Sequence, residues 1–555
     1  MTKITGFEEL LKKKIAITFG IGQEEIKKFS FSSPPAHLNC DVSISWPISA
    51  AKFLKKPPIE IAEKIASLLT GEFAVNASVL PPGFVNVEFP CEFLANSAKE
   101  MISTQDYFVD AKNKAEKVNI EFVSANPTGP LHLASGRAAT LGDSLARIMK
   151  FLGYDVSTEY YVNDAGRQVE LLGLSLKARY SAAEPPENGY KGEYLKEIAA
   201  KIPSGSEISD AGFSKLAVDE ILQQHKKALR DFGVKFDRWF FESELLSGDK
   251  LNKALELLKS RGMVLEKDGA VWFGSSCEQA DADDKDRVLV KSGGKPTYFL
   301  SDIAYHMDKF DRGFTRLIDI WGADHHGYVP RMKSAIQAIG KKNESFTVII
   351  HQLVYLKRGE QIVKMSKREG EFVTLKELLD EAGKDACRFF FATRSPNTHF
   401  NFDIDLAKKQ SQENPVYYVQ YVHARICSIF RNAAGAGRHC PQSVPRALGA
   451  AEKNISAEKT DFPEVALNPE ERKILAKLIW FEKILKNCVQ ELSPHSLTSY
   501  LAELAGLFHS FYDKHKVLDA TDMETTEFRI FLLKGVKFVI SKGLDLLGVS
   551  APEKM

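Results

Sequence analysis

Long hydrophobic runs are missing from this chain of 555 residues. Its most apolar stretch, 530–547, is interrupted by three lysines and one aspartate, whereas a membrane-spanning helix needs about 20 consecutive apolar residues. The first residues, Met1–Glu9, also lack the apolar segment of a secretory signal. We therefore expect a cytoplasmic protein that has no contact with a membrane.

The chain also has few cysteines and a small net charge. The seven cysteines are an odd number and include no Cys-x-x-Cys pair, so the sequence offers neither a disulfide framework nor a zinc template. We expect reduced thiols and no protein-bound metal. The formal net charge of +1 neither favours nor excludes RNA as a partner, because a large polyanion needs only a local basic face.

A separate N-terminal domain is indicated by its own mixture of patterns. Apolar residues at helical spacing in 7–15 and 59–69 predict two helices, and 41–45 and 84–89 are strand candidates. These elements predict an α+β domain over residues 1–110.

The rest of the chain is too long for one core and changes pattern once more. We predict a nucleotide-binding α/β domain over 111–407, with a surface excursion at 184–212 that is rich in Pro, Gly, Glu and Ser. Helical spacing then continues to the end, apart from a polar break at 433–470, which predicts an all-α domain over 408–555.

The segment Asn126–Arg137 reads Asn-Pro-Thr-Gly-Pro-Leu-His-Leu-Ala-Ser-Gly-Arg. It follows an alternating apolar run at 118–123 and precedes apolar residues at helical spacing over 141–152, so we predict a strand, a turn and a helix. Backbone N–H groups at a helix N-terminus bind anions, and His132 can donate a hydrogen bond to a phosphate. The turn is therefore a candidate triphosphate site.

A second segment, Lys364–Gly370, lies about 230 residues later and reads Lys-Met-Ser-Lys-Arg-Glu-Gly. Ammonium groups stabilise a departing pyrophosphate, so we predict that His132, Lys364 and Lys367 carry out nucleotide activation. Either segment alone has a plainer interpretation, namely a capping or core histidine and a solvated basic run. Together they favour a single nucleotide site. Thr374–Glu377 further predicts a capping box that fixes the next helix.

These two segments resemble the HIGH and KMSKS motifs of class I aminoacyl-tRNA synthetases, and longer strings narrow the resemblance to the arginyl-tRNA synthetases. The strings, which extend the resemblance over nearly the whole chain, are Glu159–Gly166, Asp283–Val290, Tyr298–His306, Gly322–Gly327 and Asn414–Tyr421. The resemblance implies a Rossmann-like parallel-sheet catalytic domain between an N-terminal tRNA-contacting domain and a helical anticodon-binding domain. It also implies ligation of L-arginine to tRNA(Arg) with ATP, which carries Mg²⁺, by a monomer.

The resemblance places ATP against residues of both motifs, namely His132, Ala134, Ser135, Gly136, Arg137, Lys364, Met365, Ser366 and Lys367. The first motif departs from the family pattern His-x-Gly-His at two positions. Ala134 replaces the glycine against which the adenine ring lies, and Ser135 replaces a second histidine. Because a hydroxyl group still forms hydrogen bonds but carries no charge, we expect an active enzyme with a modified ATP site.

Recognition of arginine requires carboxylates and planar acceptors, because the guanidinium group presents five donors in a rigid fork. Tyr298 and Asp302 are four residues apart, so they share one face if the segment is helical. The resemblance assigns both to arginine binding, together with Glu121, Asn126, Glu242, Asp324 and His325.

Three other patterns suggest ligand sites and are rejected. We expect Asp324–His326 to be extended, so neighbouring side chains would point in opposite directions and not converge on one metal. The calcium-like run 281–292 has Asp286 where a glycine is required and Ser292 where a glutamate is required. In 293–297 the spacing is not that of a P-loop.

The C-terminal domain carries tyrosines interleaved with basic residues, of which Tyr417, Tyr421 and Arg425 are the predicted tRNA contacts. Aromatic rings stack on unpaired bases and cations pair with phosphates, but tyrosines at helical spacing are equally typical of a core. The resemblance assigns this domain to the anticodon, and loosely assigns 40–56 and 81–87 to the outer corner of the tRNA.

Two other functions stay open at this point. A noncatalytic tRNA-binding paralogue would explain the altered first motif, but a decayed site should have lost several residues together, and Asn126, Tyr298 and Asp302 are intact. A class I synthetase for another amino acid is the second alternative. A neutral substrate would, however, leave Asp302 as an unpaired charge in its pocket.

Overall fold

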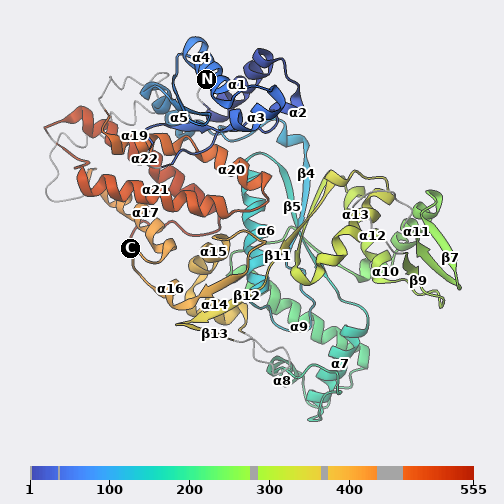
Figure 1. Ribbon diagram of the computed structural model, residues 1–555. Helices are drawn as coiled ribbons and strands as arrows, with labels where there is room; N and C mark the ends of the chain where they lie inside the picture. Colours follow the sequence, from blue (N-terminus) through green and yellow to red (C-terminus); the bar gives the residue numbers. More distant parts are fainter. Residues whose placement is uncertain (1–2, 36–37, 275–285, 364–372, 434–466, 520) are drawn as a thin grey trace.

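The computed structural model describes residues 3–35, 38–274, 286–363, 373–433, 467–519 and 521–555. The N-terminal region packs helices against an antiparallel sheet with strand order β1–β3–β2 (Figure 1). Its elements are α1 (Ile4–Phe19), α2 (Gln23–Ile26), β1 (Val42–Ile44), α3 (Trp46–Leu54), α4 (Pro58–Phe73), β2 (Asn76–Leu80), β3 (Phe84–Glu88) and α5 (Cys91–Ser103). The predicted helices and strands are present, and the α+β character is confirmed. Strand β2 was not predicted. Only Ala77 and Val79 face inward in it, and Leu80 breaks the alternation of apolar and polar residues.

The central region is built on a parallel sheet with strand order β11–β10–β4–β5–β6. The strands are β4 (Lys117–Glu121), β5 (Asp155–Val162), β6 (Arg238–Phe241), β10 (Arg316–Gly322) and β11 (Phe346–His351). The chain runs outward from β4 to β6 and then returns to the other side of β4, so the strand order reverses there. Ligands of such doubly wound sheets bind outside the carboxyl ends of the strands at this reversal. The predicted Rossmann-like class is confirmed.

Helices and a small antiparallel sheet fill the connections between these strands. They are η1 (Asn113–Ala115), α6 (Leu133–Phe151), α7 (Arg167–Tyr180), α8 (Glu193–Ala200), α9 (Asp210–Asp231), α10 (Ser243–Leu246), α11 (Lys250–Ser260), β7 (Val264–Lys267), β8 (Ala270–Phe273), β9 (Arg287–Val290), α12 (Tyr298–Asp311), η2 (Ala323–Tyr328), α13 (Val329–Ala338) and η3 (Asn343–Ser345).

Helices α7, α8 and α9 pack on one another and form a lobe, residues 167–231, at the bottom of Figure 1. The sequence predicted only a surface excursion at 184–212. The structure corrects this expectation, because the stretch contains α8. The buried side chains of Leu195 and Ile198 join α8 to the hydrophobic core.

A third sheet and the C-terminal helices complete the chain. They comprise β12 (Val354–Arg358), β13 (Gln361–Val363), α14 (Leu375–Ala382), α15 (Lys384–Ala392), β14 (Phe400–Asp403), α16 (Ile404–Lys408), α17 (Pro415–Arg431), α19 (Pro469–Leu478), α20 (Phe481–Gln490), α21 (His495–Lys514) and α22 (Met523–Leu546). The described residues after 408 are helical, as predicted, and most of the polar break lies outside them. Within the described ranges, no helix is long and apolar enough to cross a membrane.

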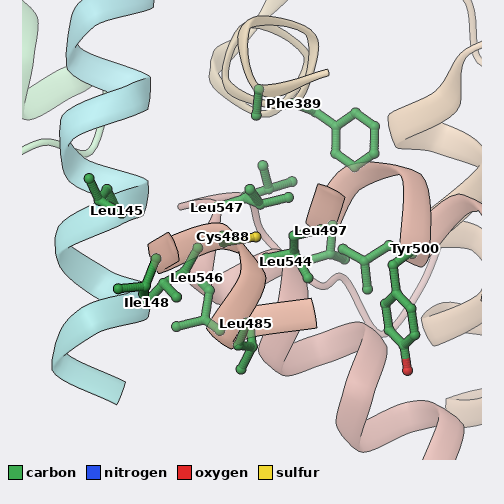
Figure 2. Packing of buried hydrophobic residues seen from close by; sticks show 14 of the residues in the cluster. Leu145, Ile148, Phe389, Leu485, Cys488, Leu497, Tyr500, Leu544, Leu546 and Leu547 are labelled. Atoms are coloured by element: carbon green, nitrogen blue, oxygen red, sulfur yellow. The ribbon is translucent and has the colours of Figure 1, made fainter. Parts of the chain in front are cut away.

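One hydrophobic core continues from the central region into the C-terminal helices. Figure 2 shows Leu145 and Ile148 of α6 near side chains of α20 and of the end of α22. Arg388 of α15 is fully buried at this junction, where its guanidinium group pairs with Asp143 of α6 at 2.5 Å and donates to the Leu547 carbonyl at 2.7 Å. The C-terminal segment is thus bonded to two helices of the central region.

The N-terminal region sits beside the C-terminal helices α19, α20 and α22 (Figure 1). Arg472 of α19 pairs with Asp41 at 2.7 Å, and the Trp480 indole donates to the Asp41 carbonyl at 3.1 Å. The N-terminal region is therefore held by the C-terminal helices.

Candidate active site

The first predicted motif contacts residues that follow the second motif in the chain. His132 is the N-cap residue of α6 and forms an isolated antiparallel bridge with Thr374. Next to this bridge, the Leu375 N–H donates to the Leu131 carbonyl at 2.8 Å. The chain that follows the second motif therefore re-enters the fold directly at the first motif, which brings together segments far apart in sequence.

The start of α14 is fixed by the predicted capping box. The Thr374 hydroxyl accepts from the Glu377 N–H at 3.1 Å, and the Glu377 carboxylate accepts from the Thr374 N–H at 2.7 Å. This prediction is confirmed. The residues predicted to bind ATP in the second motif lie outside the described part of the chain: Lys364, Met365, Ser366 and Lys367.

The turn between β4 and the first motif has a strained backbone. Val123 has φ 70° and Ser124 has φ 35°, and a β-branched residue in this region costs on the order of 1–3 kcal/mol. The Ser124 hydroxyl donates to Glu121 at 2.9 Å and accepts from the Tyr161 N–H at 3.0 Å. Asn126 follows immediately and is exposed, with its amide donating to Gln168 at 3.0 Å.

The start of α6 divides the predicted ATP-binding residues into two groups. His132 and Ala134 are partly exposed, whereas Ser135 is only 6% exposed. A methyl group on Gly136 would lie 2.8 Å from Leu375 and 3.1 Å from Phe391, so this glycine allows close helix packing.

Arg137 faces the interior too. It is 2% exposed and donates to the carbonyls of Gln352, Ser395 and Thr398, each at 2.9 Å. Burial lowers the pKa of Arg137 to about 10. In this structure Gly136 and Arg137 have packing and bracing contacts, and their predicted contacts with ATP stay predictions.

A pair of carboxylates, Asp302 and Glu242, lies at the carboxyl edge of the sheet. Asp302 is on the first turns of α12 and accepts a hydrogen bond from the Tyr328 hydroxyl. Burial raises the pKa of Asp302 to about 6. Glu242 follows β6, and burial together with the charges of Asp302 and Asp164 raises its pKa to about 7. The two predicted arginine-binding acids are therefore mutual neighbours.

These carboxylates have no basic partner, since neither forms a salt bridge with a lysine or arginine in the described part of the chain. The Asn163 amide, in its hydrogen-bonding orientation, donates to Glu242 at 2.9 Å. Tyr298, which shares a helix face with Asp302 as predicted, is 62% exposed. Its hydroxyl lies 3.4 Å from the position that a Cβ on Gly166 would occupy. The result is a pair of neighbouring carboxylates, with the exposed Tyr298 one helical turn from Asp302.

A second group of charges lies further along α12, and its members pair with one another. Lys309 of α12 is completely buried and donates to Glu121 at 2.6 Å and to Asp319 at 3.0 Å. His306 lies between the two groups, with Nε2 2.9 Å from Asp319 and Nδ1 2.7 Å from the Asp302 carbonyl. Although burial opposes it, Lys309 lowers the pKa of Asp319 to about 2.

The same group extends to β5. Arg312 donates to both oxygens of Glu159, at 2.7 and 2.8 Å, and the Tyr305 hydroxyl donates to Glu159 at 2.7 Å. We call Glu121, Glu159, Asp319, Lys309 and Arg312 the charge platform. Glu121, predicted to bind arginine, has its two oxygens bonded to Ser124 and Lys309. Its position favours a supporting role over direct contact.

The Asp324–His326 segment differs from the expected extended conformation. It lies in the 3-10 helix η2, where the side chains of Asp324 and His325 are 81% and 60% exposed and 3.5 Å apart. The expected extended conformation, on which the rejection of a metal site depended, was therefore wrong. Among the described residues, no group of three or more His, Cys, Asp or Glu side chains is placed to hold a metal.

His351 is a site neighbour that the sequence analysis missed. It ends β11, in register with Gly322 of β10, and is 8% exposed. Burial, followed by the charge of Arg137, lowers its pKa to about 4; His132 adds to this lowering, whereas Asp324 opposes it. A neutral imidazole thus lies near the first motif. The position of His351 as a polar residue at the end of an apolar strand could have indicated in the sequence that it lies near the site.

The predicted tRNA contacts form part of an aromatic face between α17 and α21. The Tyr417 and Tyr421 rings are nearly parallel with centroids 6.4 Å apart, and Tyr421 lies 5.8 Å from the His509 ring. The Arg425 guanidinium group lies 4.8 Å from the Tyr512 ring centre. The predicted residues are partly exposed, so they are available to a ligand as well as to the core.

Three family models match the chain. "Arginyl tRNA synthetase N terminal domain" matches residues 6–89, and "tRNA synthetases class I (R), catalytic domain" matches 98–187 and 191–397. "DALR anticodon binding domain" matches 419–555. The catalytic model alone covers more than half of the chain.

Similar proteins extend over almost the full length. The arginine–tRNA ligase of Elusimicrobium minutum is 53% identical over 525 residues, 94% of each chain, and that of Thermotoga petrophila is 43% identical over 544 residues, 95% of this chain and 96% of the other. The solved Thermus thermophilus arginyl-tRNA synthetase shares the fold with a TM-score of 0.78 at 22% identity, covering 99% of this chain and 100% of its own. With its doubly wound sheet and these matches, the chain belongs to the arginyl-tRNA synthetase family.

Proposed function

We propose that this protein is an arginine–tRNA ligase that acts in translation in the cytoplasm. It activates L-arginine with ATP to give arginyl-adenylate and pyrophosphate, and then transfers the arginyl group to tRNA(Arg). The observation that carries the proposal is the carboxylate pair Asp302 and Glu242, which forms no salt bridge with a lysine or arginine among the described residues. A cationic substrate matches these two carboxylates, because it supplies the positive charge that no described lysine or arginine provides there.

Arginine binds with its guanidinium group toward Asp302. A carboxylate accepts two parallel hydrogen bonds from such a fork, and Tyr298 lies on the same helix face. Glu242 adds a second negative charge within the same field. Asn126, exposed on the turn, holds the α-amino or α-carboxylate group of the substrate and so directs that end toward the nucleotide.

In the first step, an oxygen of the arginine carboxylate attacks the α-phosphorus of ATP. The new P–O bond forms as the bond to the β-phosphate oxygen breaks, and pyrophosphate leaves. His132 donates to the phosphates at the N-terminus of α6, while Lys364 and Lys367 balance the charge that develops on pyrophosphate. Mg²⁺ enters as part of the Mg·ATP substrate. In the second step, a terminal ribose hydroxyl of the tRNA attacks the adenylate carbonyl carbon and AMP leaves.

Binding of the tRNA is divided over three segments in this proposal. Residues 1–110 contact the outer corner, 111–407 the acceptor end and 408–555 the anticodon. The proposal is supported by the aromatic face on α17, where Tyr417 and Tyr421 can stack on unpaired bases and Arg425 can pair with phosphate. We further propose that the enzyme works as a monomer.

The test is aminoacylation of total bacterial tRNA by the purified protein, with each of the 20 amino acids supplied separately alongside ATP and Mg²⁺. Charging with arginine alone is the expected result. Charging with another amino acid would refute the pocket assignment, and tRNA binding without charging would favour the noncatalytic paralogue.

The altered first motif provides a sharper test of the paralogue alternative. Ala134→Gly combined with Ser135→His restores the usual pattern of the family and is expected to retain or raise charging activity. An inactive wild type that this change rescues would identify decay of the motif. Inactivation of a working enzyme would instead show that the site depends on Ala134 and Ser135.

A further inference from the structure

Three side chains donate hydrogen bonds to three carbonyls between residues 125 and 129 of the first-motif turn, and none of the three donors belongs to that motif. The Tyr160 hydroxyl donates to the Ala125 carbonyl at 2.9 Å. The Tyr194 hydroxyl donates to the Thr128 carbonyl at 2.6 Å. The Nε2 of His225 lies 2.7 Å from the Gly129 carbonyl. They come from β5, α8 and α9, so two belong to the α7–α9 lobe.

The contacts are buried and specific in their chemistry. Tyr160 and His225 are 0% and 1% exposed, and the Tyr160 hydroxyl lies 3.1 Å from Nδ1 of His225. Because a carbonyl only accepts, the proton of a neutral His225 ring must be on Nε2, so Nδ1 can only accept and the single Tyr160 hydroxyl proton is shared between Nδ1 and the Ala125 carbonyl. Burial lowers the pKa of His225 to about 4, which keeps the ring neutral. The ring of Tyr160 is fixed by stacking on Trp239 at 4.3 Å.

The turn needs such support because its backbone is strained. The positive φ angles of Val123 and Ser124 lie immediately before the held segment 125–129. Strain of this kind persists only where the surrounding structure over-determines the conformation. Asn126, the proposed substrate contact, lies between two of the held carbonyls, so any relaxation of the turn would move it.

We propose that Tyr194 and His225, with Tyr160, are positioning residues for arginine activation: they lock the turn so that Asn126 and the start of α6 meet both substrates in reactive alignment. This inference rests on the proposed function and deepens it. The α7–α9 lobe then supports the turn, since Tyr194 of α8 donates to it. The segment that contains α8 had been expected to be only a surface excursion. The three side chains act through the backbone and not on the substrates.

The first test is Tyr194→Phe, with Tyr180→Phe as the matched control. Tyr180 lies in the same lobe, but its hydroxyl donates to the Pro203 carbonyl at 2.9 Å, away from the turn. Tyr194→Phe is expected to lower kcat for arginine charging about tenfold with little change in KM or in the Kd for tRNA, because small misalignments act on the transition state. Tyr180→Phe is expected to leave kcat within about twofold.

The second test compares two substitutions of His225. Gln places an amide N–H where Nε2 stands, whereas Leu places no donor there. His225→Leu is expected to reduce kcat about 100-fold, and His225→Gln to recover about tenfold of that loss. Circular dichroism and Tm for every variant separate lost alignment from lost folding.

Equal activity of Tyr194→Phe and Tyr180→Phe would overturn the inference, as would equal activity of the two His225 variants. A kcat that simply follows the folded fraction would also overturn it. A wild-type protein that charges no amino acid would refute the proposed function itself, whereas charging with an unaffected Tyr194→Phe variant would refute only the positioning role.

Discussion

Two groups of carboxylates lie along helix α12 and differ in their partners. Near the start of the helix, Asp302 lies close to Glu242, and neither has a described lysine or arginine partner. Burial raises the pKa of Asp302 to about 6 and that of Glu242 to about 7. Two turns later, Lys309 and Arg312 bind Glu121, Asp319 and Glu159 in the charge platform.

This difference distinguishes charge kept for a ligand from charge used for structure. Burying a carboxylate without a counterion is unfavourable, and a protein retains such a group where function requires it. A paired buried charge, in contrast, is strongly destabilising only when its partner is removed. Substitutions of Asp302 and Glu242 should therefore affect arginine, and substitutions in the platform should affect folding.

The largest effect is expected for Asp302→Asn. Loss of one partner of a buried charge pair lowers kcat/KM for arginine about 1000-fold, or about 4 kcal/mol. Thermal stability should stay constant or rise, because a desolvated charge disappears. Steady-state charging assays and thermal denaturation measure both effects. Asp311→Asn, at the exposed end of the same helix, is the control and should change neither.

Lys309→Met should have the opposite profile. It leaves Glu121 and Asp319 buried without their cation, so the free energy of unfolding should fall by about 3 kcal/mol or more. Urea denaturation followed by circular dichroism measures the loss. Unchanged stability would contradict the division between the platform and the carboxylate pair.

Arginine affinity should depend on pH in a defined direction. Guanidinium binding needs ionised Asp302 and Glu242, whose folded pKa values lie above their ordinary ones, so affinity falls as pH decreases through 7 and 6. We expect the Kd for arginine to rise at least about tenfold from pH 7.5 to 5.5. Calorimetric titration measures this change.

The unliganded protein should respond to pH with the opposite sign. Raised carboxyl pKa values mean that the folded state binds more protons than the unfolded state between about pH 4 and 7, so these groups add stability as pH falls and remove it as pH rises. Asp302→Asn should flatten this slope. An unchanged slope would show that Asp302 is ionised at both ends of the range.

The smallest effect is expected for Tyr328→Phe. The Tyr328 hydroxyl donates to Asp302 and stabilises its charged form. Its removal should raise KM for arginine about threefold to tenfold and move the midpoint of the pH profile upward. A midpoint that moves downward would contradict the assigned donor.

The sequence was informative where neighbours along the chain are also neighbours in space. Alternation at 118–123 followed by helical spacing predicted the strand, turn and helix of the first motif, and four-residue spacing placed Tyr298 and Asp302 on one face. The parallel class was implied by the resemblance to the class I synthetases, and the strand, turn and helix of the first motif fit it, because such a unit builds parallel sheets.

Contacts between distant segments were not predictable in the same way. Glu121 and Lys309 are 188 positions apart, so no spacing revealed that Glu121 was already paired. Helical periodicity marked α6, but not which side of its first turn faces α14 and α15, so the buried contacts of Gly136 and Arg137 were not predicted. The bridge between His132 and Thr374 depends likewise on the assembled fold.

The buried guanidinium group of Arg388 has a consequence for biosynthesis. Its hydrogen-bond acceptor, the Leu547 carbonyl, lies 159 positions further along the chain. A protein that folds from its N-terminus during translation must hold the Arg388 guanidinium group incompletely satisfied until Leu547 has left the ribosome. Emergence of Leu547 is then the event that completes the contacts between α6, α15 and the C-terminal helices.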